Sequence, residues 1–186
     1  MEQDRIEMRF CGFGGQGVVL GSVIYATALA KEGYNVVQSQ VYGIEARGGA
    51  SSGEAMYSDK PIHHLHVTQP DILLAMSQKA LDKFIDTVKP GGIVLCDSFY
   101  IDQFPKRTDV KVYKAPLTEI AITQLGKELF ANALAMGFIN GIIKNVSQEH
   151  LVEALLESIG NKAVEQNRKA VELGYETGLK VLKEQN

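Results

Sequence analysis

The chain has 186 residues, 45% of them hydrophobic, and its 22 acidic and 19 basic residues give a formal net charge of −3. This length suits one domain with its own core, so we expect residues 1–186 to form a single domain. The small negative charge and the lack of a basic run exclude the usual footprint of a nucleic-acid-binding protein. The charged start, MEQDRIEMRF, and the lack of a long apolar run argue against a signal peptide and a membrane span, so we expect a cytoplasmic protein with no membrane partner.

The first motif in chain order is a glycine-rich turn between a predicted strand and a predicted helix. Residues 6–11 form an apolar run typical of a buried strand, and a helical pattern covers 18–31 with Gly33 as its C-terminal cap. Glycines at such a turn let backbone N–H groups, at the positive end of the helix, approach a phosphate or a carboxylate. The candidate binding residues of this turn are Gly12, Gly14, Gly15, Gln16 and Gly17.

A dinucleotide site would also need an acidic residue at the end of the second strand, about 20 residues further on. That strand is predicted over 34–40, with Gln38 and Ser39 near its end, and no acidic residue lies between Glu32 and Glu45. The turn is therefore of the Rossmann type without the residue that binds ribose, which disfavours NAD.

The second motif is the segment 42–52, which reads YGIEARGGASS and is too rich in glycine for a regular element. A long ordered loop of this kind is usually functional. The planar fork of Arg47 suits a phosphate or a carboxylate, and the glycines after it allow a close approach. The alternative is that Glu45 and Arg47 form an ion pair that holds the loop. The candidate residues here are Tyr42, Glu45, Arg47, Gly48 and Gly49.

The rest of the chain predicts an α/β fold with a mostly parallel, Rossmann-like sheet and helices on both faces. Further strands are predicted at 53–57, 71–76, 92–96 and 109–114, and a helix at 78–88. The C-terminal third is predicted to be helical, over 117–126, 129–144, 147–159 and 162–183, with Ser147 and Asn161 as N-caps. We expect this third to pack on the sheet or to reach a neighbouring subunit.

The carboxyl ends of parallel strands are where ligands bind in such sheets. Besides the two motifs, the residues expected at this edge are Ser77, Asp97, Ser98 and Pro116, with Asp97 contributing a charge to the crevice. The chain shows no catalytic triad, no paired carboxylates and no Walker lysine, so we expect it to hold no catalytic residue.

The cysteines and the histidines have simple structural interpretations. Cys11 and Cys96 are too few and too far apart for an iron–sulfur cluster or a zinc site, so we expect buried, reduced side chains. His63, His64 and His66 suggest a metal site, but no nearby carboxylate or cysteine supports it, and a surface strand or loop is favoured.

Helix 129–144 contains a stripe of small residues, Ala133, Gly137 and Gly141, at four-residue spacing. Each internal glycine costs a helix about 1 kcal/mol relative to alanine. We favour tight packing of this stripe on the sheet. The other interpretation is a subunit interface, through which isolated chains would form homodimers.

The two motifs together, GFGGQGVVLG at 12–21 and YGIEARGGASSGE at 42–54, resemble the gamma subunit of the 2-oxoacid:ferredoxin oxidoreductases. The resemblance extends through DILLAMSQKALDKF at 71–84, ANALAMG at 131–137 and NKAVEQNRKAVELGY at 161–175. EARGGAS is more similar to the 2-oxoglutarate or general 2-oxoacid type than to the pyruvate type, which tends to have an arginine-rich motif ending in Gly-Ala-Pro-Val.

The resemblance implies a non-catalytic gamma subunit of an enzyme that oxidatively decarboxylates a 2-oxoacid to acyl-coenzyme A and passes electrons to ferredoxin. In this family thiamine diphosphate lies on the alpha and beta subunits, and iron–sulfur clusters lie on beta or on a ferredoxin-like delta subunit. The chain itself would hold no cofactor and would be inactive alone. Our hypothesis is that the glycine turn and residues 45–49 face the partner subunits near the point where coenzyme A enters.

Two alternatives stay open at this point. One is a self-sufficient nucleotide-binding protein or small reductase, which would bind NAD, a flavin or a nucleotide as an isolated chain. The other is a subunit of the indolepyruvate branch of the same family, which shares the glycine turn and differs in substrate.

Overall fold

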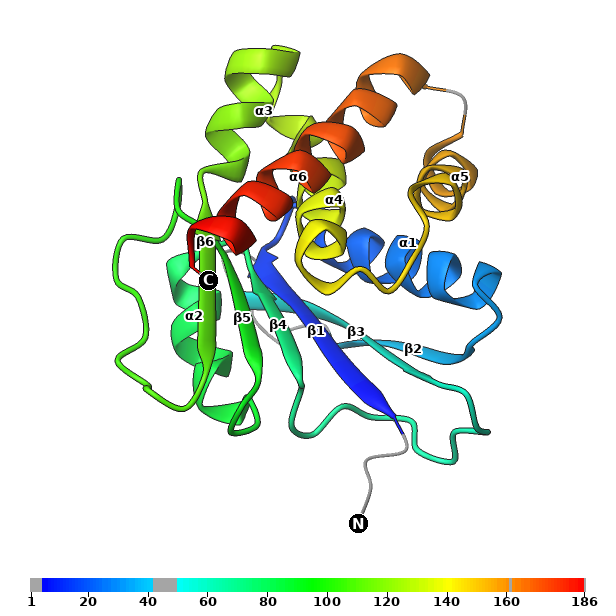
Figure 1. Ribbon diagram of the computed structural model, residues 1–186, viewed down its shortest axis with the longest axis vertical. Helices are drawn as coiled ribbons and strands as arrows, with labels where there is room; N and C mark the ends of the chain where they lie inside the picture. Colours follow the sequence, from blue (N-terminus) through cyan, green and yellow to red (C-terminus); the bar gives the residue numbers. More distant parts are fainter. Residues whose placement is uncertain (1–4, 42–49, 161, 186) are drawn as a thin grey trace.

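The computed structural model describes residues 5–41, 50–160 and 162–185, and these residues form a six-stranded sheet with helices on both faces (Figure 1). This confirms the predicted α/β class. In chain order the elements are β1 (Ile6–Phe13), α1 (Val18–Lys31), β2 (Asn35–Val41), β3 (Ala50–Ser58), β4 (Ile72–Ala75), α2 (Gln78–Phe84), η1 (Ile85–Thr87), β5 (Ile93–Asp97), β6 (Lys111–Ala115), α3 (Leu117–Leu125), η2 (Glu128–Phe130), α4 (Ala131–Ile143), α5 (Gln148–Ile159) and α6 (Val164–Glu184).

The strands follow the order β2-β3-β1-β4-β5-β6, and only β3 runs against the others. The sequence predicted a short strand at 53–57, but β3 is longer and lies between β1 and β2, antiparallel to both. In a dinucleotide-binding sheet the first two strands are neighbours. Here β3 separates them.

Helix α1 has the bounds that the sequence predicts, because glycines define both of its ends. Gly17 precedes it with a φ of 74°, a conformation that glycine adopts without strain. At its other end Gly33 has a φ of 96°, and its N–H donates to the carbonyl of Ala30. The N–H of Tyr34 donates to the carbonyl of Leu29, which completes a Schellman motif and confirms Gly33 as the terminating residue.

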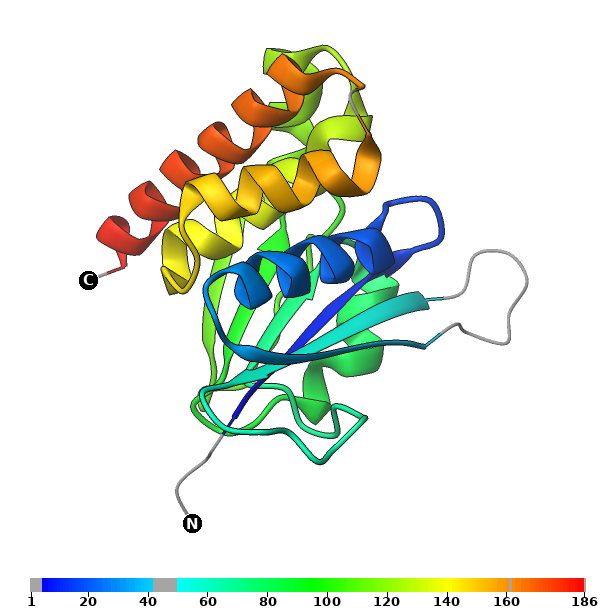
Figure 2. The same ribbon diagram turned by 90° about the vertical axis from the view of Figure 1, so that its right-hand side faces the viewer.

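The sheet separates two apolar cores of unequal size. Met8 and Phe10 of β1 face the larger core, which contains side chains from α1, α3, α4, α5 and α6. Cys11 faces the smaller core, formed with α2 and the segments beside it. Figure 2 shows α1 next to the sheet and α5 in a further row away from it. The C-terminal end of α6 reaches the edge strand β6, where Nε2 of Gln185 donates to the carbonyl of Val112 at 3.1 Å.

The glycine stripe of α4 packs against α6, not against the sheet as we favoured from the sequence. A Cβ atom on Gly141 would lie 3.0 Å from the Cα of Gly178, and one on Gly178 would lie 2.9 Å from the Cα of Gly141. Gly137 meets the backbone of α6 in the same way, at Val171 and Tyr175. Because α6 of the same chain covers this stripe, it is not free to form a homodimer interface.

The sequence predicted N-cap residues for the last two helices, and the described structure tests one of them. The hydroxyl of Ser147 accepts a hydrogen bond of 3.1 Å from the N–H of His150, which confirms Ser147 as the N-cap of α5. Helix α6 begins at Val164, after Ala163 with a φ of 48°. The predicted cap Asn161 lies outside the described residues.

Candidate functional site

The glycine turn lies between the end of β1 and the start of α1. The N–H of Gln16 donates to the carbonyl of Phe13 at 3.3 Å, and Gly15 has a φ of 104° that favours glycine. Added Cβ atoms on Gly14 and Gly15 would meet no atom within 4 Å. One side of the turn is therefore open, and its role in binding a ligand or a partner stays a prediction.

The side chain of Gln16 closes the other side of the turn. Its Oε1 accepts a hydrogen bond of 2.9 Å from the N–H of Phe13, and its Nε2 donates one of 2.7 Å to the carbonyl of Met76, the residue after β4. A Cβ atom on Gly12 would overlap Oε1 of Gln16. Gly12 thus makes room for the side chain and does not line the open side, a role that the sequence did not reveal.

A cavity of about 530 Å³ lies beside the turn, a size typical of small-molecule sites. Phe13, Gly15, Gln16 and Gly17 form part of its lining. The rest is mostly apolar and comes from the residue after β4, from α1, α3, η2, α4 and α5, and from α6 with the two residues before it. These residues are Leu20, Met76, Thr118, Glu128, Leu129, Phe130, Ala131, Asn132, Ala133, Leu155, Ile159, Lys162, Ala163 and Asn167. Leu129 is 79% exposed, an unusual position for a large apolar side chain.

Asp97 lies at the carboxyl end of β5, but it does not contribute a charge to the crevice as we expected. It is fully buried, and its carboxylate accepts hydrogen bonds from the hydroxyl of Thr118 at 2.6 Å and from the N–H of Phe99 at 3.1 Å. Burial raises the pKa of this carboxyl group above its usual value. Asp97 therefore holds the start of α3 and places Thr118 at the cavity.

The other residues expected at this edge have backbone or structural roles. The N–H of Ser98 donates to the carbonyl of Ala115, and Pro116 is the N-cap of α3. The hydroxyl of Ser77 is buried and makes no hydrogen bond with any residue in the described part of the chain.

An aromatic cluster borders the turn, and the sequence analysis missed it. The ring of Tyr100 packs edge to face on those of Phe13 and Phe99, with centroid distances of 5.4 and 4.9 Å. The hydroxyl of Tyr100 donates to Glu128 at 2.7 Å, and this hydrogen bond raises the pKa of Tyr100 to about 12. These contacts join the end of β5 to η2 at the rim of the cavity.

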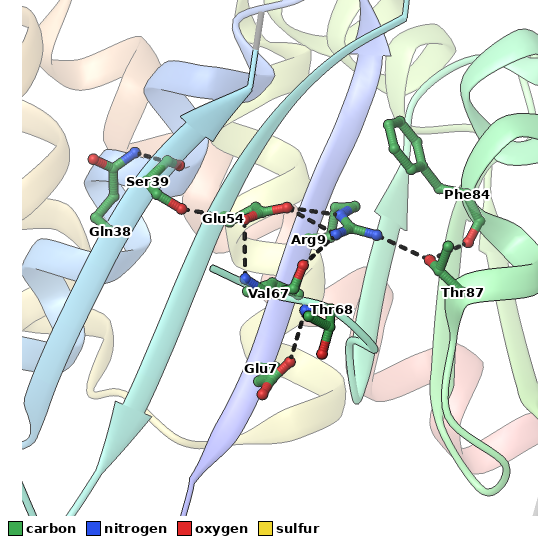
Figure 3. Close-up of polar contacts among 9 residues, drawn as sticks. All are labelled: Glu7, Arg9, Gln38, Ser39, Glu54, Val67, Thr68, Phe84 and Thr87. Atoms are coloured by element: carbon green, nitrogen blue, oxygen red, sulfur yellow. Dashed lines mark hydrogen bonds and ion pairs between the residues drawn. The ribbon is translucent and has the colours of Figure 1, made fainter. Parts of the chain in front are cut away.

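A buried ion pair crosses the opposite face of the sheet, away from the cavity lining (Figure 3). Nη2 of Arg9 lies 2.8 Å from Oε1 of Glu54, and the two residues are direct partners in the β1–β3 register. Arg9 also donates to the carbonyl of Val67 and to the hydroxyl of Thr87, while Glu54 accepts from Ser39. The sequence feature that could have indicated this pair is Arg9, a charged residue inside an apolar strand. Our sequence analysis did not use it.

The end of the second motif, from Ala50 on, belongs to β3, although the sequence predicted an irregular segment up to residue 52. Tyr42, Glu45, Arg47, Gly48 and Gly49 all lie outside the described residues. Its binding role and its internal ion pair both stay predictions.

His63, His64 and His66 are exposed in the loop between β3 and β4, as the surface interpretation predicted. Within residues 5–41, 50–160 and 162–185, no group of three or more His, Cys, Asp or Glu side chains is arranged to hold a metal ion. Cys11 and Cys96 are buried and free, and burial raises the pKa of the Cys96 thiol to about 12. Over the same ranges, none of the helices combines the length and the apolar character that a bilayer crossing requires.

The described chain thus combines an α/β sheet with an open glycine turn and a mostly apolar cavity beside it. The chain belongs to the pyruvate ferredoxin/flavodoxin oxidoreductase family, whose model matches residues 7–177. It is 42% identical over 175 residues to the 2-oxoglutarate synthase subunit KorC of Methanocaldococcus jannaschii, covering 92% of this chain and 93% of that one. The family resemblance of the two motifs is thereby confirmed.

Solved structures agree with this assignment. The gamma subunit of a keto/oxoacid ferredoxin oxidoreductase from Geobacter sulfurreducens is 38% identical, with a TM-score of 0.87 over 96% of this chain and 99% of that one. The 2-oxoglutarate:ferredoxin oxidoreductase from Magnetococcus marinus, solved with coenzyme A bound, shares the fold at 24% identity and a TM-score of 0.83. That match covers 96% of this chain and 32% of the longer one.

Proposed function

We propose that this chain is the gamma subunit of a multi-subunit 2-oxoacid:ferredoxin oxidoreductase that acts on 2-oxoglutarate. The observation that supports this most strongly is the near full-length similarity to a 2-oxoglutarate synthase subunit, 42% identical over 175 residues. A second such subunit, from Archaeoglobus fulgidus, is 35% identical over 178 residues. The complex would convert the 2-oxoacid to acyl-coenzyme A and pass the electrons to ferredoxin.

The chain would contribute a binding surface to the complex, and its partner subunits would hold the reactive cofactors. In the described part of the cavity lining the charged side chains are Glu128 and Lys162, among apolar groups and backbone amides. A lining of this kind orients a ligand and offers little for proton transfer. We place thiamine diphosphate and the iron–sulfur clusters on the alpha, beta and ferredoxin-like delta partners. The cytoplasmic location stays a prediction.

The glycine turn and residues 45–49 would face these partners near the point where coenzyme A enters. The open side of the turn supports this, since Gly14 and Gly15 leave the backbone exposed to an approaching molecule. Phosphates of coenzyme A are ligands that backbone N–H groups at a helix start can bind.

Substitution of Gly14 by leucine tests this placement, because a Cβ atom at this position would meet no atom within 4 Å in the isolated chain. We expect Gly14→Leu to fold normally and, in the complex reconstituted with alpha and beta subunits, to raise the KM for coenzyme A by about tenfold or to prevent assembly. Ala30→Leu is the matched control, since Ala30 is exposed at the far end of α1. Wild-type assembly and an unchanged KM for Gly14→Leu would refute the placement.

Arg47→Ala is the second arm of the same experiment. If Arg47 binds a coenzyme A phosphate, its removal raises the KM for coenzyme A in an intact complex. An unchanged KM with intact assembly would remove the ligand role and leave the interface role.

A self-sufficient nucleotide-binding protein is the competing function. Two observations disfavour it. The N–H of Phe13 already donates its hydrogen bond to the side chain of Gln16, and β3 separates β1 from β2. Titration of the purified chain with NAD, flavin nucleotides and ATP should show no binding. Assay of the reconstituted complex with several 2-oxoacids, including indolepyruvate, would identify the branch of the family.

A further inference from the structure

Gln16 is the one side chain that joins the glycine turn to the neighbouring strand end in the described structure. Its two hydrogen bonds, 2.9 Å from the N–H of Phe13 and 2.7 Å to the carbonyl of Met76, use both ends of its carboxamide. Met76 is itself bound to β1, since its N–H donates to the carbonyl of Cys11 at 2.8 Å. The turn is therefore tied to two adjacent strands of the sheet.

The space around Gln16 is fitted to its side chain. A Cβ atom on Gly12 would overlap Oε1 of Gln16 and lie 3.2 Å from the Cβ of Met76. Gly12 lies within β1, where its φ does not demand glycine. The need for glycine at this position is thus the room that it leaves for the Gln16 carboxamide.

Three other backbone donors of the turn have no hydrogen-bond partner within the described chain. The N–H groups of Gly14, Gly15 and Gly17 make no hydrogen bond with another residue of the described chain. A turn fixed in advance binds more tightly than a mobile one, because it loses less conformational freedom when the ligand arrives.

We propose that Gln16 is a positioning residue, which fixes the glycine turn so that its free N–H groups meet the phosphates of coenzyme A in the assembled enzyme. This inference rests on the proposed function. It assigns to Gln16 a part in coenzyme A affinity and none in the conversion of the 2-oxoacid.

Gln16→Met tests this inference, because methionine has a similar length and no strong hydrogen-bonding group. In the isolated chain we expect the amide of Phe13 to exchange its hydrogen faster than in the wild type. In the reconstituted complex we expect the KM for coenzyme A to rise about tenfold, as loss of an ordered binding loop implies, while kcat and the KM for 2-oxoglutarate change far less. The matched control is Gln124→Met, since Gln124 is exposed on α3.

Gly12→Ala is a second, independent variant, because its methyl group displaces the Gln16 carboxamide without altering Gln16 itself. It should give the same selective rise in the KM for coenzyme A. A KM for coenzyme A within about twofold of the wild type, measured for a variant whose Phe13 amide exchanges its hydrogen faster, would overturn the inference. So would a parallel change in the KM for 2-oxoglutarate, or failure of both variants to assemble, since either result would make Gln16 purely structural.

Gly14→Leu separates this inference from the proposed function. If Gly14→Leu raises the KM for coenzyme A and Gln16→Met does not, the turn lies at the coenzyme and only the role of Gln16 is wrong. If neither variant changes it in an intact complex, the placement of the turn is wrong as well.

Discussion

The guanidinium group of Arg9 links three segments that are far apart in the sequence. It contacts Glu54 on β3, Val67 in the following loop and Thr87 in η1, and both charged side chains of the pair are more than nine-tenths buried. A buried charge is tolerated only when it is paired and hydrogen-bonded, so these contacts depend on one another.

Arg9→Met should therefore destabilise the chain strongly, because it leaves the Glu54 carboxylate buried beside an apolar group. We expect a loss of about 3 to 5 kcal/mol in the free energy of unfolding, measured by urea denaturation of the isolated chain. The control Lys31→Met removes solvent-exposed ion pairs with Glu153 and Glu157 and should cost far less, because water and salt screen such pairs. A similar small loss for Arg9→Met would show that the pair is not a stabilising contact.

At the scale of elements, α4 and α6 approach each other more closely than ordinary side chains allow. A Cβ atom on Gly174 would overlap the carbonyl oxygen of Leu134 and lie 2.9 Å from the N–H nitrogen of Phe138. Backbone atoms cannot rotate away as a side chain does, so the two helices would have to separate.

Gly174→Ala should consequently lower the melting temperature of the chain, with a loss of about 3 kcal/mol or more in the free energy of unfolding. Gly21→Ala is the comparison, because its Cβ would meet only the movable ends of Asn132 and Met136, while helix propensity improves by about 1 kcal/mol. Equal effects of the two substitutions would contradict the close-packing account.

The sequence predicted the elements well where local signals define them. The bounds of α1 follow from Gly17 and Gly33, and the strands β4 and β5 follow from short apolar runs. The position of β3 between β1 and β2 depends on pairing between distant residues, which no local pattern encodes. The partner of the α4 stripe and the contacts of Gln16 were missed for the same reason.

The sequence located the glycine turn between β1 and α1, whereas the binding role of the turn stays a prediction. The cavity beside the turn joins residues from 13 to 167 that only the fold brings together. Asp97 was assigned a charge at the crevice because of its position after β5. Asp97 is instead fully buried, and its contact with the hydroxyl of Thr118, a residue distant in the sequence, appears only in three dimensions.

At the scale of the whole molecule, the described residues form an α/β sheet with helices on both faces, and the chain belongs to the pyruvate ferredoxin/flavodoxin oxidoreductase family. The described residues offer backbone donors and an apolar cavity at that edge. We propose that turnover needs partner chains and that this chain completes their coenzyme A site.

Reconstitution tests that claim most directly. The rate of ferredoxin reduction is measured with 2-oxoglutarate and coenzyme A, for this chain alone, for its alpha and beta partners alone, and for all of them together. We expect turnover only from the complete assembly, with 2-oxoglutarate preferred over pyruvate and indolepyruvate. Turnover by the isolated chain, or full activity of the partners without it, would contradict the account.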